Sequence, residues 1–183
     1  MPKKHITLIL SILTAFGIIA SQFSGYNLAY LSGESIEAKV LKIYDGDTAT
    51  LLHNGNTLKV RLYGIDAPEL KQKFGVESRN NLKKLCPIQS NIQLQIKYKD
   101  KYGRIVGILK CNNQDANAMQ VAQGYAWAYK EHSLAYMHLE LKAKLKSKGL
   151  WSEENPIKPS LYRKQTSQYK QWATAHIPPE DLE

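Results

Sequence analysis

Four carboxylates and one arginine lie within the segment from Asp45 to Glu69. The acids are Asp45, Asp47, Asp66 and Glu69, and the arginine is Arg61. Hard carboxylate oxygens suit Ca²⁺ or Mg²⁺ rather than Zn²⁺. Two carboxylates that are held close together repel unless a positive charge lies between them. The segment therefore indicates a site for a hard metal ion.

Three runs of alternating apolar residues predict the strands that hold these side chains. The runs comprise Val40 and Ile43, residues 48–52, and Leu58, Val60 and Leu62. Asp45-Gly46 and Asn54-Gly55 are turn signals between them, so the pattern predicts a three-stranded antiparallel meander. Because each hairpin reverses the chain, Asp47 and Asp66 are predicted to be neighbours at one end of the sheet.

Two further residues follow the ends of predicted elements. Pro68 cannot donate to a strand ladder, so the third strand stops there and Glu69 lies just beyond the metal. Residues 100–104 (Asp-Lys-Tyr-Gly-Arg) predict another tight turn, with Arg104 at its exit. A guanidinium group binds phosphate oxygens in pairs. The candidate site thus combines carboxylates that bind a metal ion with an arginine that binds a phosphate group.

Three motifs in this order resemble the staphylococcal nuclease (thermonuclease) family. They are DGDT at residues 45–48, RLYGIDAPE at 61–69 and DKYGR at 100–104. The resemblance extends from about Ser35 to Glu153. It implies an α+β protein built on a five-stranded OB-fold barrel. It also implies a nuclease that hydrolyses DNA and RNA with one bound Ca²⁺ and little sequence preference.

The resemblance assigns the ligands of that ion. Asp47 and Asp66 correspond to residues that bind Ca²⁺ through their carboxylates, and Ala67 to one that binds through its backbone carbonyl. The family more often has threonine in place of Ala67, so the substitution spares the ligand and removes a hydroxyl. Asp45 is expected to shape the turn rather than to bind the metal.

The resemblance also assigns catalytic and substrate-binding residues. Glu69 corresponds to a glutamate that orients or deprotonates the attacking water. Arg61 and Arg104 correspond to arginines that bind phosphate and stabilise the transition state. The residues expected at the substrate phosphate and bases are Lys101, Tyr102 and Tyr129.

The remaining pattern predicts two more strands and about three helices. The strands cover residues 92–98 and 105–110, and the helices cover residues 76–85, 116–123 and 133–148. Asp115 is a candidate N-cap for the second helix. Four residues at helical spacing are expected to face the core from the third helix: Leu134, Met137, Leu141 and Leu145. This order of elements matches the OB-fold, although the bare pattern also allows other small barrels.

The two cysteines are predicted to form a disulfide. If the fourth and fifth strands pair about their turn, positions near 92 and 111 lie opposite one another, and Cys86 is a short loop away from Cys111. Export from the cytoplasm would favour the bond. Two separate buried thiols are the alternative. No Cys or His spacing indicates zinc.

The ends of the chain differ from its centre. Lys3, Lys4 and the apolar run of residues 6–20 are typical of an export signal to the periplasm or the medium, and an uncleaved membrane anchor over residues 6–23 is the alternative. We expect signal and linker over residues 1–33, one domain over 34–155 and a tail without a regular period over 156–183. The protein is predicted to be a monomer.

The charge agrees with a nucleic-acid partner. The net charge is +9, and removing residues 1–20, which contribute +2, leaves +7 on the rest of the chain. A basic protein attracts phosphates, although a basic surface also serves solubility. The rival to a nuclease is a non-catalytic barrel that binds nucleic acid or protein; such domains lack some of the acidic or arginine positions present here. An anchored surface protein whose barrel binds another ligand is a third possibility.

Overall fold

The computed structural model describes residues 33–176. The candidate export signal or anchor over residues 6–23 lies outside the described residues. Within the described part of the chain, no helix combines the length and the apolar character that crossing a membrane requires.

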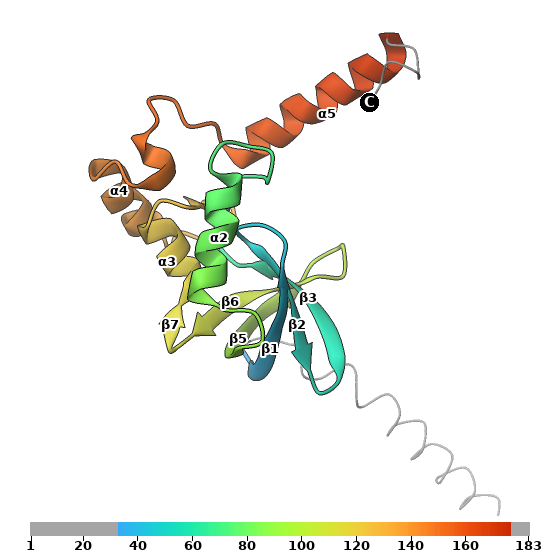
Figure 1. Ribbon diagram of the computed structural model, residues 1–183, viewed down its shortest axis with the longest axis vertical. Coiled ribbons are helices and arrows are strands. Elements are labelled where there is room, and N and C mark those ends of the chain that lie inside the picture. Colours follow the sequence, from blue (N-terminus) through green and yellow to red (C-terminus); the bar gives the residue numbers. More distant parts are fainter. Residues whose placement is uncertain (1–32, 177–183) are drawn as a thin grey trace, which may run out of the picture.

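Five strands form a closed barrel, as the sequence predicts (Figure 1). The meander is present, since β1 pairs with β2 and β2 with β3, both antiparallel. β1 also pairs with β5, and β5 with β6. A parallel pairing of β3 with β6 closes the barrel. These strands are β1 (Ser35–Ile43), β2 (Thr48–His53), β3 (Asn56–Leu62), β5 (Asn91–Lys99) and β6 (Ile105–Cys111).

The turns and the core follow the sequence pattern. Asn54 and Gly55 both have positive φ, at 47° and 78°, which is the conformation that a tight hairpin requires. Alternate residues of each strand point into the barrel, so its interior is apolar. Fully buried examples are Val40, Leu51, Val60, Leu94 and Leu109.

Three very short strands add to the barrel. β7 extends the main sheet beside β6, whereas β4 and β8 pair only with each other. None of the three was predicted, because a strand of two residues shows no periodicity. They are β4 (Ile65–Asp66), β7 (Gln114–Asp115) and β8 (Trp127–Ala128).

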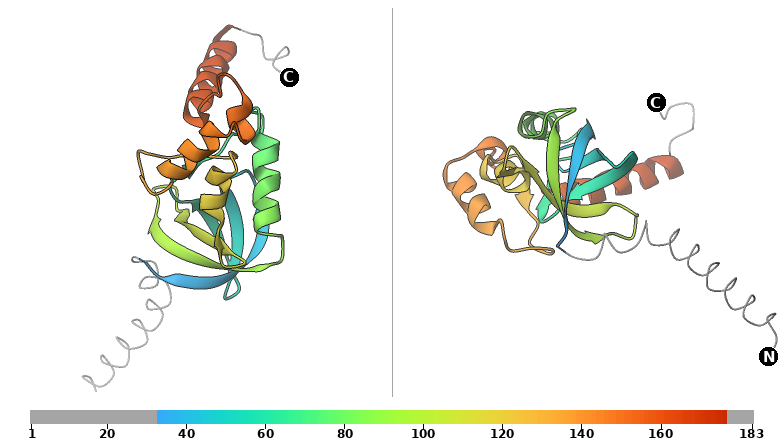
Figure 2. Two further views of the ribbon diagram at one scale, coloured as in Figure 1. Left: turned by 90° about the vertical axis from the view of Figure 1, so that its left-hand side faces the viewer. Right: turned by 90° about the horizontal axis from the view of Figure 1, so that it is seen from below.

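Residues 33–176 contain four α-helices and one 3-10 helix, one α-helix more than predicted. Asp115 caps α3 as expected, because its side chain accepts a hydrogen bond from the backbone nitrogen of Ala118. α2 and α3 lie side by side against the barrel (Figures 1 and 2). The helices are α2 (Gly75–Leu85), α3 (Ala116–Ala122), α4 (Met137–Leu145), the 3-10 helix (Gly149–Ser152) and α5 (Pro159–His176).

The prediction for the third helix was wrong in length and in orientation. α4 is shorter than residues 133–148. A turn in which the carbonyl of Tyr129 accepts two backbone hydrogen bonds precedes it, and Ser147 after its end has a positive φ of 45°. Its buried side chains are those of Glu140 and Ala143, and Leu139 packs partly buried against the core. Ala143 packs against Leu150 and Trp151 of the 3-10 helix. The predicted core residues are exposed by 69%, 37%, 57% and 79%, respectively, for Leu134, Met137, Leu141 and Leu145.

The predicted disulfide is present. Cys86 and Cys111 are bonded, with their Cα atoms 5.4 Å apart. Gln93 lies opposite Lys110 in the β5–β6 ladder, so the register places residue 92 opposite Cys111 as expected. The bond links the end of α2 to the end of β6.

The segment after residue 155 contains a helix that was not predicted. It was predicted to be a tail without a regular period, whereas α5 covers most of it. The first turn of α5 lies near the top of α2, and the rest of the helix projects from the body of the molecule (Figures 1 and 2).

Candidate active site

The turn between β1 and β2 fixes Asp47. The backbone nitrogen of Asp47 donates to Oδ1 of Asp45 at 3.0 Å, so Asp45 shapes the turn as predicted. Oδ2 of Asp47 accepts a hydrogen bond of 2.6 Å from the backbone nitrogen of Ala67, and Oδ1 accepts one of 3.1 Å from the hydroxyl of Thr48. Asp47 is only 3% exposed, and its carboxylate is therefore held in one orientation.

The short β4–β8 pairing fixes Asp66. Asp66 lies opposite Trp127 in this ladder and is 4% exposed. Both Asp66 and Asp47 form ion pairs with the guanidinium group of Arg61, and the distance from Nη2 of Arg61 to Oδ1 of Asp66 is 2.8 Å. The prediction that the two aspartates are neighbours is thus confirmed.

Arg61 lies between these acids because β3 closes the barrel. It is opposite Thr48 in β2 and opposite Val106 in β6. Burial lowers the pKa of Arg61, and the carboxylates of Asp66 and Asp45 oppose that shift. An arginine remains protonated in proteins, so a fixed positive charge lies between the carboxylates of Asp47 and Asp66.

A cleft of about 920 Å³ runs along this end of the barrel. It brings together most of the side chains that the sequence analysis singled out. Asp66 and Ala67 do not line it: Asp66 faces the adjoining cavity described below, and Ala67 is buried behind the wall. The singled-out residues that line the cleft are Asp45, Asp47, Arg61, Glu69, Lys101, Tyr102, Arg104 and Tyr129.

The turn at residues 100–104 presents Arg104 to the cleft. Asp100 accepts hydrogen bonds from the backbone nitrogens of Tyr102 and Arg104, each 2.9 Å, and from Nε of Arg104 at 2.8 Å. Burial alone would raise the pKa of Asp100, but these hydrogen bonds hold that pKa below its usual value. Tyr102 is 72% exposed, with Lys101 and Arg104 at 5.2 Å and 5.5 Å from its ring centroid. An exposed aromatic ring flanked by two cations suits a base beside a phosphate.

A third arginine, Arg163 of α5, enters the site from the far end of the sequence. Its Nη1 lies 2.8 Å from Oε1 of Glu69 and 3.2 Å from Oδ1 of Asp66. Its Nη2 lies 3.1 Å from Oδ2 of Asp66. Burial alone would lower the pKa of Arg163, but the carboxylates of Glu69 and Asp66 raise that pKa above its usual value. Arg163 could not be predicted from the sequence, because a single arginine in a segment without apolar periodicity carries no signal.

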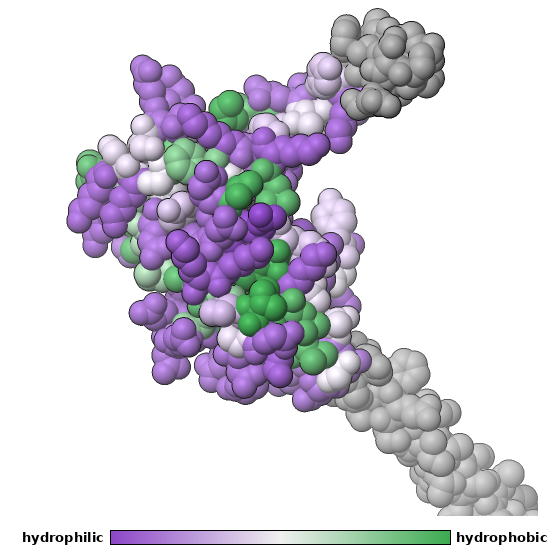
Figure 3. All heavy atoms as spheres, viewed as in Figure 1, coloured by the Kyte–Doolittle hydropathy of each residue, from purple (hydrophilic) through white to green (hydrophobic). Residues whose placement is uncertain are grey.

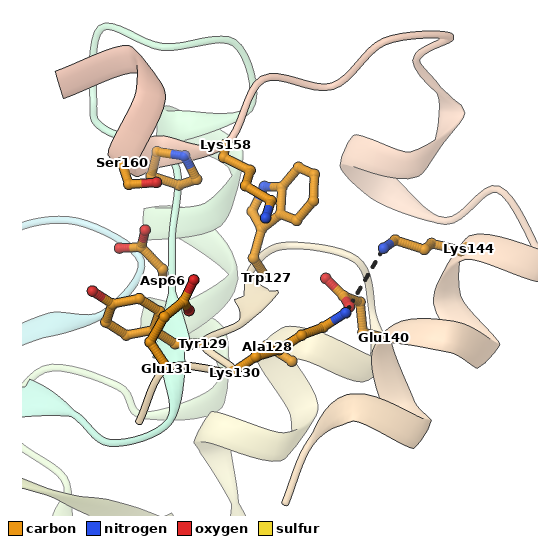
Figure 4. Close-up of a pocket in the computed structure, with 11 residues that line it drawn as sticks. Asp66, Trp127, Ala128, Tyr129, Lys130, Glu131, Glu140, Lys144, Lys158 and Ser160 are labelled. Carbon is orange, nitrogen blue, oxygen red and sulfur yellow. Dashed lines mark ion pairs between the residues drawn. The ribbon is translucent and has the colours of Figure 1, made fainter. Parts of the chain in front are cut away.

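A smaller cavity of about 160 Å³ adjoins Asp66 (Figure 4). Lys158, Pro159 and Ser160 line one side of it, so the start of α5 closes over Asp66. On the opposite side, the buried carboxylate of Glu140 lies 3.4 Å from Nζ of Lys144. Asp66 is therefore enclosed between the barrel and the start of α5.

A buried amide supports the site from behind. Gln120 of α3 is fully buried, and its Nε2 donates to the carbonyl oxygens of Gly46 at 2.7 Å and of Ser78 at 3.0 Å. A Cβ atom at Gly46 would lie 1.8 Å from Oγ of Ser78. The turn that carries Asp47 thus packs directly on α2, and only glycine fits at residue 46. Gln120 could not be predicted from the sequence, because no pattern in α3 distinguishes it from its neighbours.

The donor set fits a divalent cation. Four carboxylates, those of Asp45, Asp47, Asp66 and Glu69, lie around the guanidinium groups of Arg61 and Arg163. Oxygen ligands suit Ca²⁺ or Mg²⁺. Among residues 33–176 no three His, Cys, Asp or Glu side chains form a metal cluster. The predicted set needs only two carboxylates and the carbonyl of Ala67.

The closed barrel and its charged cleft define an OB-fold protein with an acidic and arginine-rich site. A sequence profile described as "Staphylococcal nuclease homologue" matches residues 59–153. An uncharacterised endonuclease of Haemophilus influenzae is 43% identical over 141 residues, which are 75% of this chain and 79% of that protein. The chain therefore belongs to the staphylococcal nuclease family.

Two further relatives agree with this membership. The micrococcal nuclease of Shigella flexneri is 36% identical over 139 residues, which cover 69% of this chain and 79% of that protein. An uncharacterised endonuclease of Escherichia coli is 30% identical over 131 residues, which cover 70% of this chain and 85% of that protein. The family and these relatives support a nuclease function.

Proposed function

We propose that this protein is an exported, Ca²⁺-dependent endonuclease that hydrolyses phosphodiester bonds of DNA and RNA with little sequence preference. The observation that carries the proposal is the convergence of two buried carboxylates, Asp47 and Asp66, on Arg61. Glu69 and Arg104 line the same cleft as Arg61. A barrel that only bound a strand would gain no affinity for phosphates from buried acids.

Two arginines are assigned to the scissile phosphate. The ion pair of Arg104 with Asp100 uses Nε, so its terminal nitrogens can face a phosphate in the cleft. Nη1 and Nη2 of Arg61 contact Asp47 and Asp66, and they would turn to the phosphate when a cation takes over these carboxylates. Guanidinium groups stabilise the negative charge that grows on the phosphate oxygens during hydrolysis. Phosphate contacts carry no sequence information, so cleavage would depend little on the bases.

The carboxylates of Asp47 and Asp66 and the carbonyl of Ala67 would hold the cation. A bound Ca²⁺ supplies Lewis-acid polarisation of the phosphate and neutralises charge on its oxygens. Both aspartates are almost fully buried and hydrogen-bonded. Their oxygens are therefore already oriented before a ligand arrives.

Glu69 is assigned to the water. Its side chain is 38% exposed, so it can reach a water molecule in the cleft. The water oxygen forms a bond to phosphorus while Glu69 accepts its proton. The bond from phosphorus to the leaving oxygen breaks, and that oxygen leaves with a proton from solvent. A carboxylate in this role contributes about 10²–10⁴ in rate.

Export is part of the proposal and has separate support. The disulfide between Cys86 and Cys111 is typical of an oxidising compartment, and residues 1–20 have the composition of a signal. Fractionation of cells that express the full chain tests this. Recovery in the periplasm, the medium or the membrane is expected, and recovery in the cytoplasm with reduced cysteines would contradict it.

A nuclease assay with a panel of divalent metals tests the activity. The purified protein is expected to degrade single-stranded DNA, double-stranded DNA and RNA when Ca²⁺ is present, and to stop when the ion is chelated. Intact substrates with every metal of the panel would overturn the proposed function.

A further inference from the structure

A second groove leads away from the active site along α5. Its volume is about 510 Å³, and it lies between α5 and the segment that follows Pro68. Asp45, Glu69 and Arg163 line both this groove and the active-site cleft. The two are therefore continuous, and the molecule is visibly hollowed between α5 and the barrel in Figure 3.

One face of α5 forms a wall of the groove. The residues on this face recur at helical spacing, and they are Tyr162, Arg163, Thr166, Ser167 and Lys170. This face is polar and basic. The more apolar residues Leu161 and Tyr169 do not line the groove and are 47% and 63% exposed. The groove thus combines the polar and charged ends of the α5 side chains that line it with the apolar surface of Tyr44, Leu70 and Tyr162.

The charges and rings of the groove match those of a nucleic-acid strand. Lys71 lies on the wall opposite Lys170, and Tyr44 and Tyr162 contribute aromatic rings. Lys42 lies 4.6 Å from the ring centroid of Tyr44 and adds a cation at the edge of the groove. Cations that follow the backbone and rings on which bases stack are the two features of sites for single strands.

We propose that this groove binds the part of a single nucleic-acid strand that extends beyond the scissile phosphate. This inference rests on the proposed nuclease function. The ion pairs of Arg163 with Asp66 and Glu69 hold the groove beside the candidate catalytic carboxylates. From Arg163 to Lys170 the helix rises about 10 Å, so the groove extends over a length of strand beyond the nucleotide at the active site.

Binding without cleavage provides the first test. The full chain is titrated in EDTA with labelled oligothymidylate of 20 nucleotides, and with oligouridylate of the same length, at several salt concentrations. The double variant Lys71→Gln and Lys170→Gln is expected to bind about tenfold more weakly. It is also expected to lower the slope of log affinity against log salt by about 1.4, because each lost phosphate contact removes about 0.7.

A matched control removes the same charge elsewhere. Lys83 and Lys84 lie in the last turn of α2, which is at the end of the helix away from α5 (Figure 1). The double variant Lys83→Gln and Lys84→Gln is expected to keep the affinity and the salt slope. A loss confined to the groove variant, with either DNA or RNA, supports the proposal. Equal losses in both variants, or no loss in either, would overturn it.

Cleavage rates separate the groove from the proposed function. The ratio of kcat/KM for a 20-mer to that for a 4-mer is expected to fall about tenfold in the groove variant. If the groove variant cuts both lengths with the parental ratio, strand binding in the groove is contradicted but the nuclease activity is not. A parent that cuts neither length contradicts the nuclease activity, while the titration in EDTA still decides whether the groove binds a strand.

Discussion

Arg163 and Glu69 lie 94 residues apart in the sequence and form an ion pair of 2.8 Å at the candidate active site. The same guanidinium group contacts both carboxylate oxygens of Asp66. Asp66 is a proposed ligand of Ca²⁺, so a cation at this position and the guanidinium group of Arg163 would compete for one carboxylate. The contacts of α5 with the site would therefore depend on whether a cation is bound at Asp66.

Removing this guanidinium group is expected to strengthen metal binding. In Arg163→Gln the positive charge beside Asp66 is lost, so the affinity for Ca²⁺ should rise about tenfold, which corresponds to about 1.4 kcal/mol. Titration calorimetry measures the affinity of both proteins for Ca²⁺. Lys164→Gln removes a charge from the next residue of α5, which lines neither the cleft nor the groove, and should leave the affinity unchanged. Equal affinities of the parent and Arg163→Gln would refute the competition.

Replacing the proposed base is expected to abolish most of the activity without unfolding the protein. Glu69→Gln keeps the size of the side chain and removes its charge, so kcat should fall about 10²–10⁴-fold. Single-turnover cleavage measures the loss, and thermal unfolding checks that the fold is kept. The exposed Lys110 of β6 offers a control, since Lys110→Gln should cut at the parental rate. A rate for Glu69→Gln within threefold of the parent would show that another group activates the water.

The turn that carries Asp47 is expected to tolerate no side chain at residue 46. A methyl group there would lie 1.8 Å from Oγ of Ser78 and 2.7 Å from Cβ of Ala67. Gly46→Ala should therefore lower the free energy of unfolding by about 1–3 kcal/mol, and it should also weaken metal binding because Asp47 moves. Denaturant unfolding and calorimetry report the two effects. Parental stability in Gly46→Ala would mean that α2 can move away from the turn freely.

The disulfide is expected to contribute substantially to stability. Cys86 and Cys111 are separated by 25 residues, and closing a loop of this length contributes about 3.5 kcal/mol by the chain-entropy estimate. The double variant Cys86→Ser and Cys111→Ser should lose about that amount in denaturant unfolding. Because the bond lies outside the cleft, cleavage below the melting temperature should persist. A variant as stable as the parent would contradict this account of the bond.

Much of the barrel could be predicted because its strands are regular and its turns are local. Alternation identified the five long strands, and the reversal at each hairpin placed Asp47 and Asp66 at one end of the sheet. Asn54-Gly55 adopts the turn that its residue types require. The proximity of Asp47 and Asp66 follows from strand geometry, which is why it could be predicted from the sequence. The position of Arg61 between them depends on the pairing of β3 with β2 and β6 and was not predicted.

The contribution of the C-terminal region could not be predicted by the same means. The polar inner face of α5 gives no apolar periodicity, so neither the helix nor Arg163 stood out. In α4 the apolar stripe was present but misleading. Glu140 is buried there because Lys144 and Lys130 lie 3.4 Å and 3.7 Å from its carboxylate, whereas Leu141 and Leu145 face outward. The first error concerns contacts between elements that are distant in the sequence. The second concerns a buried carboxylate whose charge is balanced by nearby lysines.

Cation-dependent cleavage in Asp66→Asn is the most direct measurement of the central claim. The amide keeps the shape of Asp66 while removing the charge that the cation and Arg61 share. The account predicts that the parent cleaves DNA with Ca²⁺ and not after chelation. It also predicts that Asp66→Asn binds Ca²⁺ at least tenfold more weakly and cuts at least a hundredfold more slowly at equal Ca²⁺. Cleavage by Asp66→Asn at the parental rate and with the parental Ca²⁺ dependence would contradict it.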